Sequence, residues 1–267
     1  AAAPHHLPPE CCTMAASQIR LAIIGCGRIL PAHLRGLQAL CAAGYDGFRI
    51  TALVANRLED ALRFRRHGEG PPPRPPTSTN PDDPPAAPDL WVSDVHAGEV
   101  AVYDDLERML AEASVDAVVI LTPHPYHHRL ALRCLRAGKH VAVEKPMAVT
   151  VRAAQAMIDA AHAAGRVLCV LESARYALGN RATAWATRSG LVGVPQLVMS
   201  IAVGLGEWSP DRILAHTPWR HQRRAGGGVV LDFGVHLTSW ARQVAGEFET
   251  VSALTATLEP TRRQCRP

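Results

Sequence analysis

Lysine, aromatic residues and long apolar runs are all scarce in this 267-residue chain. Lysine accounts for only two of the 28 lysine and arginine residues, Lys139 and Lys145, and aromatic residues make up 5% of the chain. Because the arginines form no basic run and few aromatic residues accompany them, a dedicated nucleic-acid surface is not expected. No stretch approaches the ~18 consecutive apolar residues that a membrane-spanning helix needs. The sequence therefore predicts neither nucleic acid nor a membrane as a partner.

Cysteine pairs are also lacking. The seven cysteines are an odd number without metal-ligand spacing, and the adjacent Cys11 and Cys12 lie in a tail, residues 1–13, that is rich in proline and histidine. This tail lacks the basic-then-apolar order of a secretory signal. We expect a disordered tail and a reducing, cytoplasmic setting.

The order of predicted elements indicates two domains. Strands are predicted at 18–24, 48–55, 117–121, 140–144 and 167–171, and helices at 31–43, 57–66, 104–113, 126–137 and 151–164. This alternation is typical of an α/β fold with a doubly wound parallel sheet covered on both faces. After Glu172 the pattern changes, because 196–203 and 250–257 look like longer strands and one helix starts near Gly228. A first domain at 14–171 and a second at 172–267 are therefore expected.

A proline-rich segment interrupts the first domain. Residues 71–89 hold nine prolines, which cannot donate backbone hydrogen bonds and favour extended conformations. We interpret the segment as a surface insertion. It is either a flexible loop or a proline-rich ligand for a docking partner.

A glycine-rich turn follows the first predicted strand, with the sequence Gly25-Cys26-Gly27-Arg28-Ile29-Leu30. The first glycine permits a tight turn, and the second lets the backbone approach a pyrophosphate at the start of the next helix. Leucine stands at the third glycine position, so this helix should pack slightly farther from the strand. A turn that binds no ligand is the alternative.

The second predicted strand ends before Asn56 and Arg57, where an NAD site normally places an acidic residue on the ribose 2′-hydroxyl. A guanidinium can bind a 2′-phosphate, and neither residue carries a carboxylate that would repel it. The sequence therefore favours NADP over NAD. An ordinary solvated arginine at the start of a helix is the alternative interpretation of Arg57.

One of the two lysines lies at the carboxyl end of a predicted strand, in Glu144-Lys145-Pro146. Ligands of open α/β sheets bind at this edge. A desolvated lysine can lose its proton near neutral pH, whereas arginine stays protonated. We therefore expect Lys145 to exchange a proton with substrate, and Lys139 to be exposed and structural.

A third motif runs from Gly226-Gly227-Gly228 to Asp232 and His236. If one helix begins at the glycines, Asp232 and His236 lie four residues apart on one face, so that the carboxylate could orient the imidazole for proton transfer. The glycines indicate close backbone approach. A helical salt pair on the surface is the alternative, and no metal site is expected, because no third ligand is spaced nearby.

With these three motifs in order, the chain resembles the Gfo/Idh/MocA family of nicotinamide-dependent oxidoreductases over about residues 19–257. The match also includes His33, Thr122, Pro123, His127, Arg175, Tyr176, Trp219 and Arg220. The resemblance implies an N-terminal Rossmann domain. It also implies a C-terminal α/β domain whose mostly antiparallel sheet often mediates homo-oligomerisation.

The resemblance assigns roles to individual residues. Proton transfer would belong to Lys145 and His236, with Asp232 assisting. The motifs and the resemblance together give as cofactor-binding residues Gly25, Gly27, Arg28, Ile29, Asn56, Arg57, Thr122, Pro123, His127, Glu144 and Lys145. The substrate would be bordered by Arg175, Tyr176, Trp219 and Arg220, although interdomain packing is an equally open role for the last two.

The implied activity is hydride transfer between NADP or NAD and a secondary alcohol of a sugar, cyclitol or related polyol or diol. An NAD-assisted glycosidase, which gives no net cofactor reduction, is one alternative, and a non-catalytic nucleotide-binding fragment is another. The second alternative arises because the chain ends at Pro267, where family members continue for several more strands. We therefore expect a partial C-terminal domain, and a homo-oligomer if its sheet is complete.

Overall fold

A six-stranded parallel sheet forms the centre of the structure. The computed structural model describes residues 18–72, 74, 86, 88–201 and 217–256. The strands are β1 (Ile19–Ile24), β2 (Phe48–Val54), β3 (Ala101–Tyr103), β4 (Ala117–Ile120), β5 (His140–Glu144) and β6 (Leu168–Leu171). Their order is β3-β2-β1-β4-β5-β6, and all neighbours are parallel. The winding direction reverses between β1 and β4, which is where open α/β sheets bind ligands.

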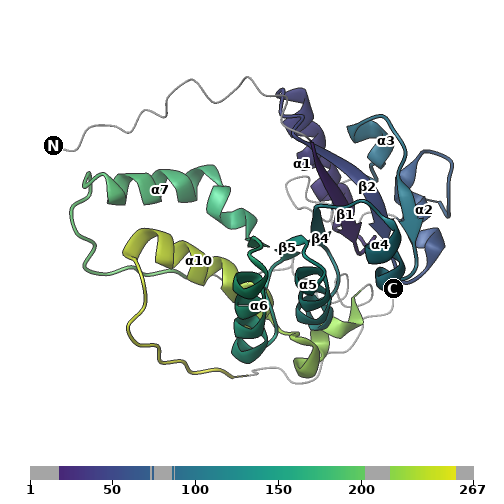
Figure 1. The fold of residues 1–267 in the computed structure, drawn as a ribbon. Helices are drawn as coiled ribbons and strands as arrows, with labels where there is room; N and C mark the ends of the chain where they lie inside the picture. Colours follow the sequence, from purple (N-terminus) through teal and green to yellow (C-terminus); the bar gives the residue numbers. More distant parts are fainter. Residues whose placement is uncertain (1–17, 73, 75–85, 87, 202–216, 257–267) are drawn as a thin grey trace, which may run out of the picture.

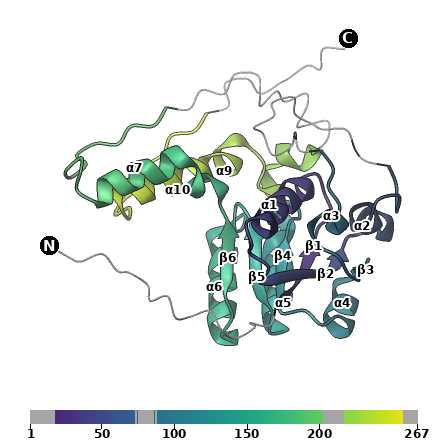
Figure 2. The ribbon, with the colours of Figure 1, turned by 90° about the horizontal axis from the view of Figure 1, so that it is seen from above.

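Helices cover both faces of this sheet (Figures 1 and 2). They are α1 (Leu30–Ala42), α2 (Leu58–Arg65), α3 (Val92–Val95), α4 (Leu106–Glu112), α5 (His127–Arg136) and α6 (Val151–Ala164). Met109 of α4, Leu135 of α5 and Met157 of α6 join one buried apolar cluster. Leu34 of α1 and Phe64 of α2 join a second cluster. These two clusters confirm the predicted doubly wound α/β arrangement.

Local sequence explains where the elements near the sheet edge begin and end. Thr150 caps α6 by accepting the Ala153 N–H at 3.2 Å, and Gly165 ends this helix with a left-handed φ of 60°. The strand at 140–144 and the helix at 151–164 have the predicted bounds. Because all six strands are parallel, their carboxyl ends lie at the same edge of the sheet. The predicted motifs follow β1, β4 and β5 at this edge.

Two elements after the proline-rich segment were not predicted, the short helix α3 and the edge strand β3. In β3 the Ala101 side chain is exposed and Tyr103 is buried, so the strand carries a three-residue alternation that is too short to be distinctive. Of the proline-rich residues 71–89, positions 73, 75–85 and 87 lie outside the described residues, as does the tail at 1–13. The surface insertion and the disordered tail therefore stay predictions.

The chain after β6 forms a helical region beside the sheet. It contains the 3-10 helices η3 (Ser173–Tyr176), η4 (Pro218–His221) and η5 (Arg223–Ala225), and the helices α7 (Leu178–Arg188), α9 (Val229–Asp232) and α10 (Gly234–Ala245). Helices α7 and α10 contact each other and extend away from the sheet (Figures 1 and 2). Among the described residues, no helix combines the length and the apolar character that crossing a membrane requires.

The strands predicted at 196–203 and 250–257 are wrong for the parts that are described. Residues 196–201 and 250–256 contain no strand, and 202–203 and 257 lie outside the described residues. A strand needs a hydrogen-bonded neighbour to satisfy its backbone groups, and neither segment pairs with another described segment. Apolar β-type composition alone could not reveal whether such a neighbour exists.

Candidate active site at the carboxyl edge of the sheet

The turn after β1 has the shape that its glycines predict. Gly25 has φ +105°, and a Cβ there would lie 2.8 Å from the backbone carbon of Leu121, so only glycine fits. A Cβ on Gly27 would meet nothing within 4 Å, which leaves open space beside the turn. Leu30, at the third glycine position, is fully buried as the first residue of α1.

The hydroxyl of Thr122 provides a test of whether a dinucleotide fits this edge. Its Oγ1 atom is buried and has no hydrogen-bond partner among the described residues. Its Cγ2 atom lies close to Gly25, since a Cβ on that glycine would be 3.0 Å away. An unsatisfied buried hydroxyl beside an open glycine turn fits a polar ligand whose phosphate or ribose oxygens reach this point.

The end of β2 holds both the predicted arginine and an acidic neighbour. Asn56 and Arg57 are exposed, and the Arg57 guanidinium forms an ion pair with Glu59. The expectation that no carboxylate lies here considered only positions 56 and 57, and Glu59 corrects it. Arg57 can still turn toward a 2′-phosphate, since both partners of this pair are solvent-exposed. Nearby, Arg28 is partly buried, and burial lowers the pKa of its guanidinium.

His127 clamps the ends of β4 and β5 together. Its ring is fully buried, with Nδ1 2.9 Å from the Pro146 carbonyl oxygen and Nε2 2.7 Å from that of Thr122. Burial lowers the pKa of His127, and the two carbonyls oppose that shift. Because backbone carbonyls lie against both nitrogens, His127 positions Thr122 and Pro146 rather than offering a ring nitrogen to a ligand.

Glu144 is similarly engaged at the end of β5. Its Oε1 lies 2.8 Å from Nε2 of His33 on α1, and its Oε2 accepts the Lys145 N–H at 2.9 Å. These contacts fix the start of the segment that carries Lys145. Lys139 lies away from this edge and donates from Nζ to the Val115 carbonyl at 2.8 Å. It is partly buried rather than exposed as predicted, because this hydrogen bond holds its side chain against the protein.

Lys145 joins the sheet to the helical region. Its Nζ donates to Oδ1 of Asp232 at 2.9 Å and to the Asp232 carbonyl at 2.7 Å. The other carboxylate oxygen, Oδ2, accepts from Nε of Arg220 at 2.9 Å. Burial alone would raise the pKa of Asp232, but Arg220 and Lys145 outweigh it and hold that pKa below its ordinary value. The motifs at 144–146 and 226–236 therefore meet through this contact.

His124 belongs to this cluster, although it was not predicted. It is 3% exposed, its Nδ1 lies 3.3 Å from the Gly226 carbonyl oxygen, and its Nε2 lies 3.6 Å from Oδ1 of Asp232. Burial lowers the pKa of His124 to about 4, despite the nearby carboxylate. The available signal was its position directly after Pro123, between two residues already assigned to the cofactor side.

The carboxylate partner of His236 differs from the one expected. The helix is interrupted at Phe233, between α9 and α10, so Asp232 and His236 do not share one helical face. Asp232 turns to Lys145, whereas Nδ1 of His236 lies 2.6 Å from Oε1 of Glu172 at the end of β6. Glu172 was missed because 64 residues separate it from His236.

The glycine segment makes the close backbone approach that was predicted. A Cβ on Gly227 would lie 2.1 Å from the Arg220 carbonyl oxygen, and one on Gly226 would lie 2.8 Å from the Val149 side chain. Trp219 packs edge-on against His124, with ring centroids 4.5 Å apart, and the Arg220 guanidinium stacks over Trp219. Trp219 and Arg220 therefore border Lys145 and Asp232.

Two predicted substrate residues lie farther out. Arg175 and Tyr176 are exposed on η3, and Tyr176 is 74% exposed. The Arg175 carbonyl accepts from Gln243 of α10 at 3.4 Å, and within the described residues neither side chain forms a hydrogen bond or an ion pair with Lys145. Among the described contacts, nothing brings these two side chains into the cluster.

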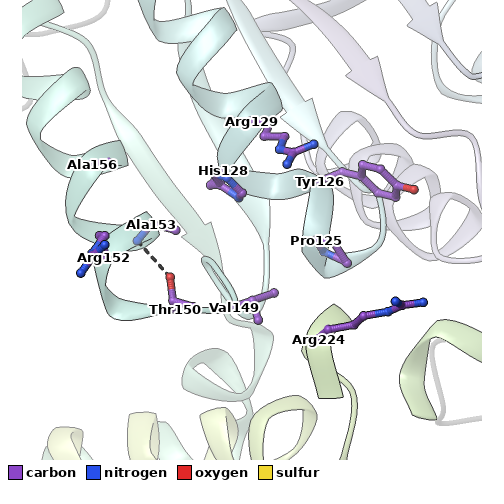
Figure 3. A pocket seen from close by; sticks show the side chains of 10 residues that line it. All are labelled: Pro125, Tyr126, His128, Arg129, Val149, Thr150, Arg152, Ala153, Ala156 and Arg224. Atoms are coloured by element: carbon purple, nitrogen blue, oxygen red, sulfur yellow. Dashed lines mark hydrogen bonds between the residues drawn. The ribbon is translucent and has the colours of Figure 1, made fainter. Parts of the chain in front are cut away.

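A cavity of about 560 Å³ adjoins this cluster on the side of α5 and α6 (Figure 3). It is lined by the first turns of those helices and by Val149 and Arg224. Lys145, Asp232 and His236 do not line it. Val149 also contacts Gly226, so the cavity lies directly behind the glycine segment.

Family models match both parts of this architecture. The model described as "Oxidoreductase family, NAD-binding Rossmann fold" matches residues 19–172, which is more than half of the chain. The chain belongs to the Gfo/Idh/MocA oxidoreductase family. The model of the Gfo/Idh/MocA C-terminal domain matches residues 186–265.

Named relatives are reductases and dehydrogenases of sugars. The chain is 37% identical over 132 residues to 1,5-anhydro-D-fructose reductase from Ensifer adhaerens, covering 49% of this chain and 38% of that protein. It is 30% identical over 162 residues to D-glucoside 3-dehydrogenase from Escherichia coli, covering 60% of this chain and 44% of that protein. The chain thus spans less than half the length of these two relatives.

Solved structures share the fold. An oxidoreductase from Thermotoga maritima is 27% identical, with a TM-score of 0.62, and the match covers 86% of this chain and 60% of that one. The WlbA dehydrogenase from Bordetella pertussis, solved with NADH and UDP-GlcNAcA, is 22% identical with a TM-score of 0.64. That match covers 87% of this chain and 57% of WlbA.

Proposed function

We propose that this chain carries the nicotinamide-binding domain and the proton-transfer residues of an oxidoreductase acting on a secondary alcohol of a sugar, cyclitol or related polyol or diol. The observation that carries the proposal is the contact between Lys145, which follows β5, and Asp232 of the glycine motif, at 2.9 Å. It joins the edge of a dinucleotide-binding sheet to a second cluster of proton-transfer groups. The sugar substrates named for the relatives support the substrate class.

The residues of the site divide into binding and proton-transfer groups. The turn at Gly25 and Gly27, with Arg28, Ile29 and the Thr122 hydroxyl, would hold the dinucleotide, which supplies a nicotinamide that accepts or returns a hydride. Lys145 or His236 would take up the hydroxyl proton of the substrate. Asp232 accepts from Lys145 and fixes its direction toward the site.

Other residues complete the two sides of the site. Pro123, His127 and Glu144 would shape the nicotinamide side by holding the ends of β4 and β5 in place. Trp219 and Arg220 would border the substrate beside Asp232. The exposed Arg175 and Tyr176 remain a proposal for the outer edge of the substrate site.

NADP is the proposed cofactor, in preference to NAD. Arg57 lies with Asn56 after β2 and is exposed enough to bind a 2′-phosphate. Binding would require Arg57 to exchange its contact with Glu59 for the phosphate. The WlbA structure holds NADH and one relative is named as an NADP-dependent scyllo-inositol dehydrogenase, so each cofactor has a precedent.

The domain bounds, the oligomeric state and the cellular compartment are also proposals. We assign residues 14–171 to the cofactor domain and 172–267 to part of a substrate and oligomerisation domain with a mostly antiparallel sheet. A homo-oligomer would form through that sheet if the sheet is complete. A cytoplasmic setting is the remaining proposal, based on cysteines without disulfide or metal-ligand spacing.

Two measurements test the function. Fluorescence titration of the purified, folded chain with NADPH and NADH should show binding, tighter for NADPH. Absorbance of the reduced nicotinamide should then rise when NADP⁺ is supplied with a methyl D-glucoside, levoglucosan or scyllo-inositol. Absence of binding to a folded sample would contradict the proposal, and glycoside cleavage without net cofactor reduction would indicate an NAD-assisted glycosidase.

A further inference from the structure

The buried carboxylate of Glu172 contacts the imidazole of His236, which the proposed function uses for proton transfer. Glu172 ends the sheet after β6 and is 6% exposed, whereas the His236 side chain on α10 is 23% exposed. Nδ1 of His236 and Oε1 of Glu172 are 2.6 Å apart, within the range of a charge-assisted hydrogen bond. The ring therefore lies between a buried acceptor and the open side of the site.

The chemistry of this contact determines where the ring carries its hydrogen. An ionised carboxylate can only accept hydrogen bonds, so the hydrogen between the two groups belongs to Nδ1. In a neutral imidazole the second nitrogen, Nε2, then keeps its lone pair. Nε2 of His236 makes no hydrogen bond within the described residues, so that lone pair is available to a ligand.

Glu172 is itself held in place by the backbone. Its Oε1 also accepts the Ala174 N–H at 2.9 Å, which caps the 3-10 helix η3. Its Oε2 is buried and has no partner among the described residues. Among the described side chains, only that of His236 hydrogen-bonds to this carboxylate. When His236 takes up a proton, its imidazolium therefore becomes the cationic partner of Glu172.

We infer that Glu172 is a positioning residue for His236, which holds the ring in its Nδ1–H form and balances the charge that the ring gains on accepting the substrate proton. The inference rests on the proposed function for the role of His236. In the step, the alcohol O–H bond would break and its proton would bond to Nε2 of His236. The electron pair left on oxygen would form the carbonyl C=O bond, and a bound nicotinamide would accept the hydride, which carries the C–H electron pair. Glu172 neither gains nor loses a proton.

Two substitutions separate the two parts of this role. Glu172→Ala removes the acceptor, so the ring should shift toward the Nε2–H form. Glu172→Gln keeps an oxygen that can accept from Ala174 and from Nδ1–H, but it removes the charge. We expect kcat to fall by roughly 100-fold for alanine and about 10-fold for glutamine, with cofactor affinity unchanged.

A matched control lies in the sheet region, at a histidine and carboxylate pair near the surface. Asp94 also pairs with a histidine, His67 at 2.8 Å, and also accepts a backbone N–H, that of Trp91 at 3.0 Å. Asp94→Asn removes an equivalent charge from a similar pair far from Lys145. It should leave kcat and the tautomer of His236 as in the unmodified protein.

The deciding experiment combines ¹⁵N NMR of the histidine rings with steady-state kinetics on the full chain, using NADP⁺ and the same three polyols. The expected result is an Nδ1–H signal for His236 that is lost in Glu172→Ala, together with the kcat order wild type, glutamine, alanine. An unchanged tautomer in the alanine variant, or an unchanged kcat in the glutamine variant, would overturn the inference. If the unmodified protein reduces no cofactor, the proposed function fails, and the NMR comparison still decides whether Glu172 sets the tautomer.

Discussion

The sheet region, up to Glu172, and the helical region after it are stabilised in different ways. The sheet buries two extensive apolar clusters, which include Ile23, Leu34 and Val118 at no more than 1% exposure. The described part of the helical region buries only the apolar side chains of Ala184, Ala225 and Val244, whereas several larger apolar side chains are exposed. They include Leu178, Trp185, Leu197, Ile201 and Leu254.

The polar contacts at the sheet edge therefore have two roles, attachment of the helical region and formation of the proposed site. Lys145 binds Asp232, His124 contacts Gly226, and Glu172 pairs with His236, so each contact runs from the sheet edge to the helical region. Of these groups, Lys145, Asp232 and His236 are also proposed to carry the chemistry. Attachment of the helical region and formation of the site are thus expected to depend on the same contacts.

Matched leucine substitutions give the largest expected difference between the regions. Leu34→Ala, at a fully buried position of α1, should lower the free energy of unfolding by about 2–5 kcal/mol. Leu178→Ala, at a position 84% exposed on α7, should change it by less than about 0.5 kcal/mol. Urea unfolding measures both. An equal loss for the two variants would show that the helical region has an apolar core of its own.

Acidification should weaken the attachment of the helical region to the sheet region, because His124 lies between them. Its folded-state pKa of about 4 lies below the ordinary value of 6.5, so the unfolded chain takes up this proton first as the pH falls. Stability from this group is therefore fully present above about pH 6.5, declines between 6.5 and 4, and amounts to roughly 3 kcal/mol at most.

Unfolding midpoints measured across that range test the assignment. The slope between pH 6.5 and 4 should flatten in His124→Asn, whose amide can still donate to the Gly226 carbonyl. His127 also has a pKa lowered by burial and contributes to the slope in both proteins. An identical slope in the two proteins would exclude His124 as a source of the pH dependence.

The contact between Lys145 and Asp232 should control local opening more than global stability. Asp232→Asn removes the negative charge that contacts both Lys145 and Arg220. We expect the free energy of local opening of the helical region to fall by about 1–3 kcal/mol. Hydrogen exchange should become faster in η5, α9 and α10 and stay unchanged in β1, β4 and β5. Uniform acceleration in all of these elements would contradict separate stabilisation of the two regions.

The smallest expected effect concerns the cofactor alone, within the sheet region. Arg57→Ala should weaken NADPH binding by about fivefold, or about 1 kcal/mol, and leave NADH binding nearly unchanged. Glu59→Gln should strengthen NADPH binding, because it releases the guanidinium. Fluorescence titration measures both affinities, and an equal loss for the two cofactors would reject the 2′-phosphate assignment.

The contrast between the regions also explains what the sequence could predict. Buried parallel strands such as His140–Glu144 carry continuous β-type apolar runs, and Gly25 is required by a turn that its own neighbours define. These local signals predicted β1, β2, β4, β5 and β6 and the helices α1, α2, α4, α5 and α6, but not α3 or β3. Lys145 was predicted as a proton-transfer residue because proton exchange favours lysine in a chain that otherwise uses arginine.

Partners distant in sequence were harder to predict. Asp232 was assigned to His236 by helical spacing, but the break at Phe233 sends it to Lys145 instead. Glu172 and His124 carry no periodic or compositional signal. Their contacts with the helical region depend on how the residues after β6 and β4 pack against it. The same reason applies to 196–201 and 250–256, since strand pairing depends on neighbours that a single segment does not specify.

The most direct test of the central claim compares the two lysines. Lys145→Ala should abolish polyol-dependent reduction of NADP⁺ while leaving NADPH affinity nearly intact, because Nζ serves proton transfer and the dinucleotide is held by the turn after β1. Lys139→Ala, which removes a contact to the Val115 carbonyl, should leave both quantities unchanged. Equal loss of turnover and cofactor affinity in Lys145→Ala would instead make Lys145 a structural residue and contradict the account.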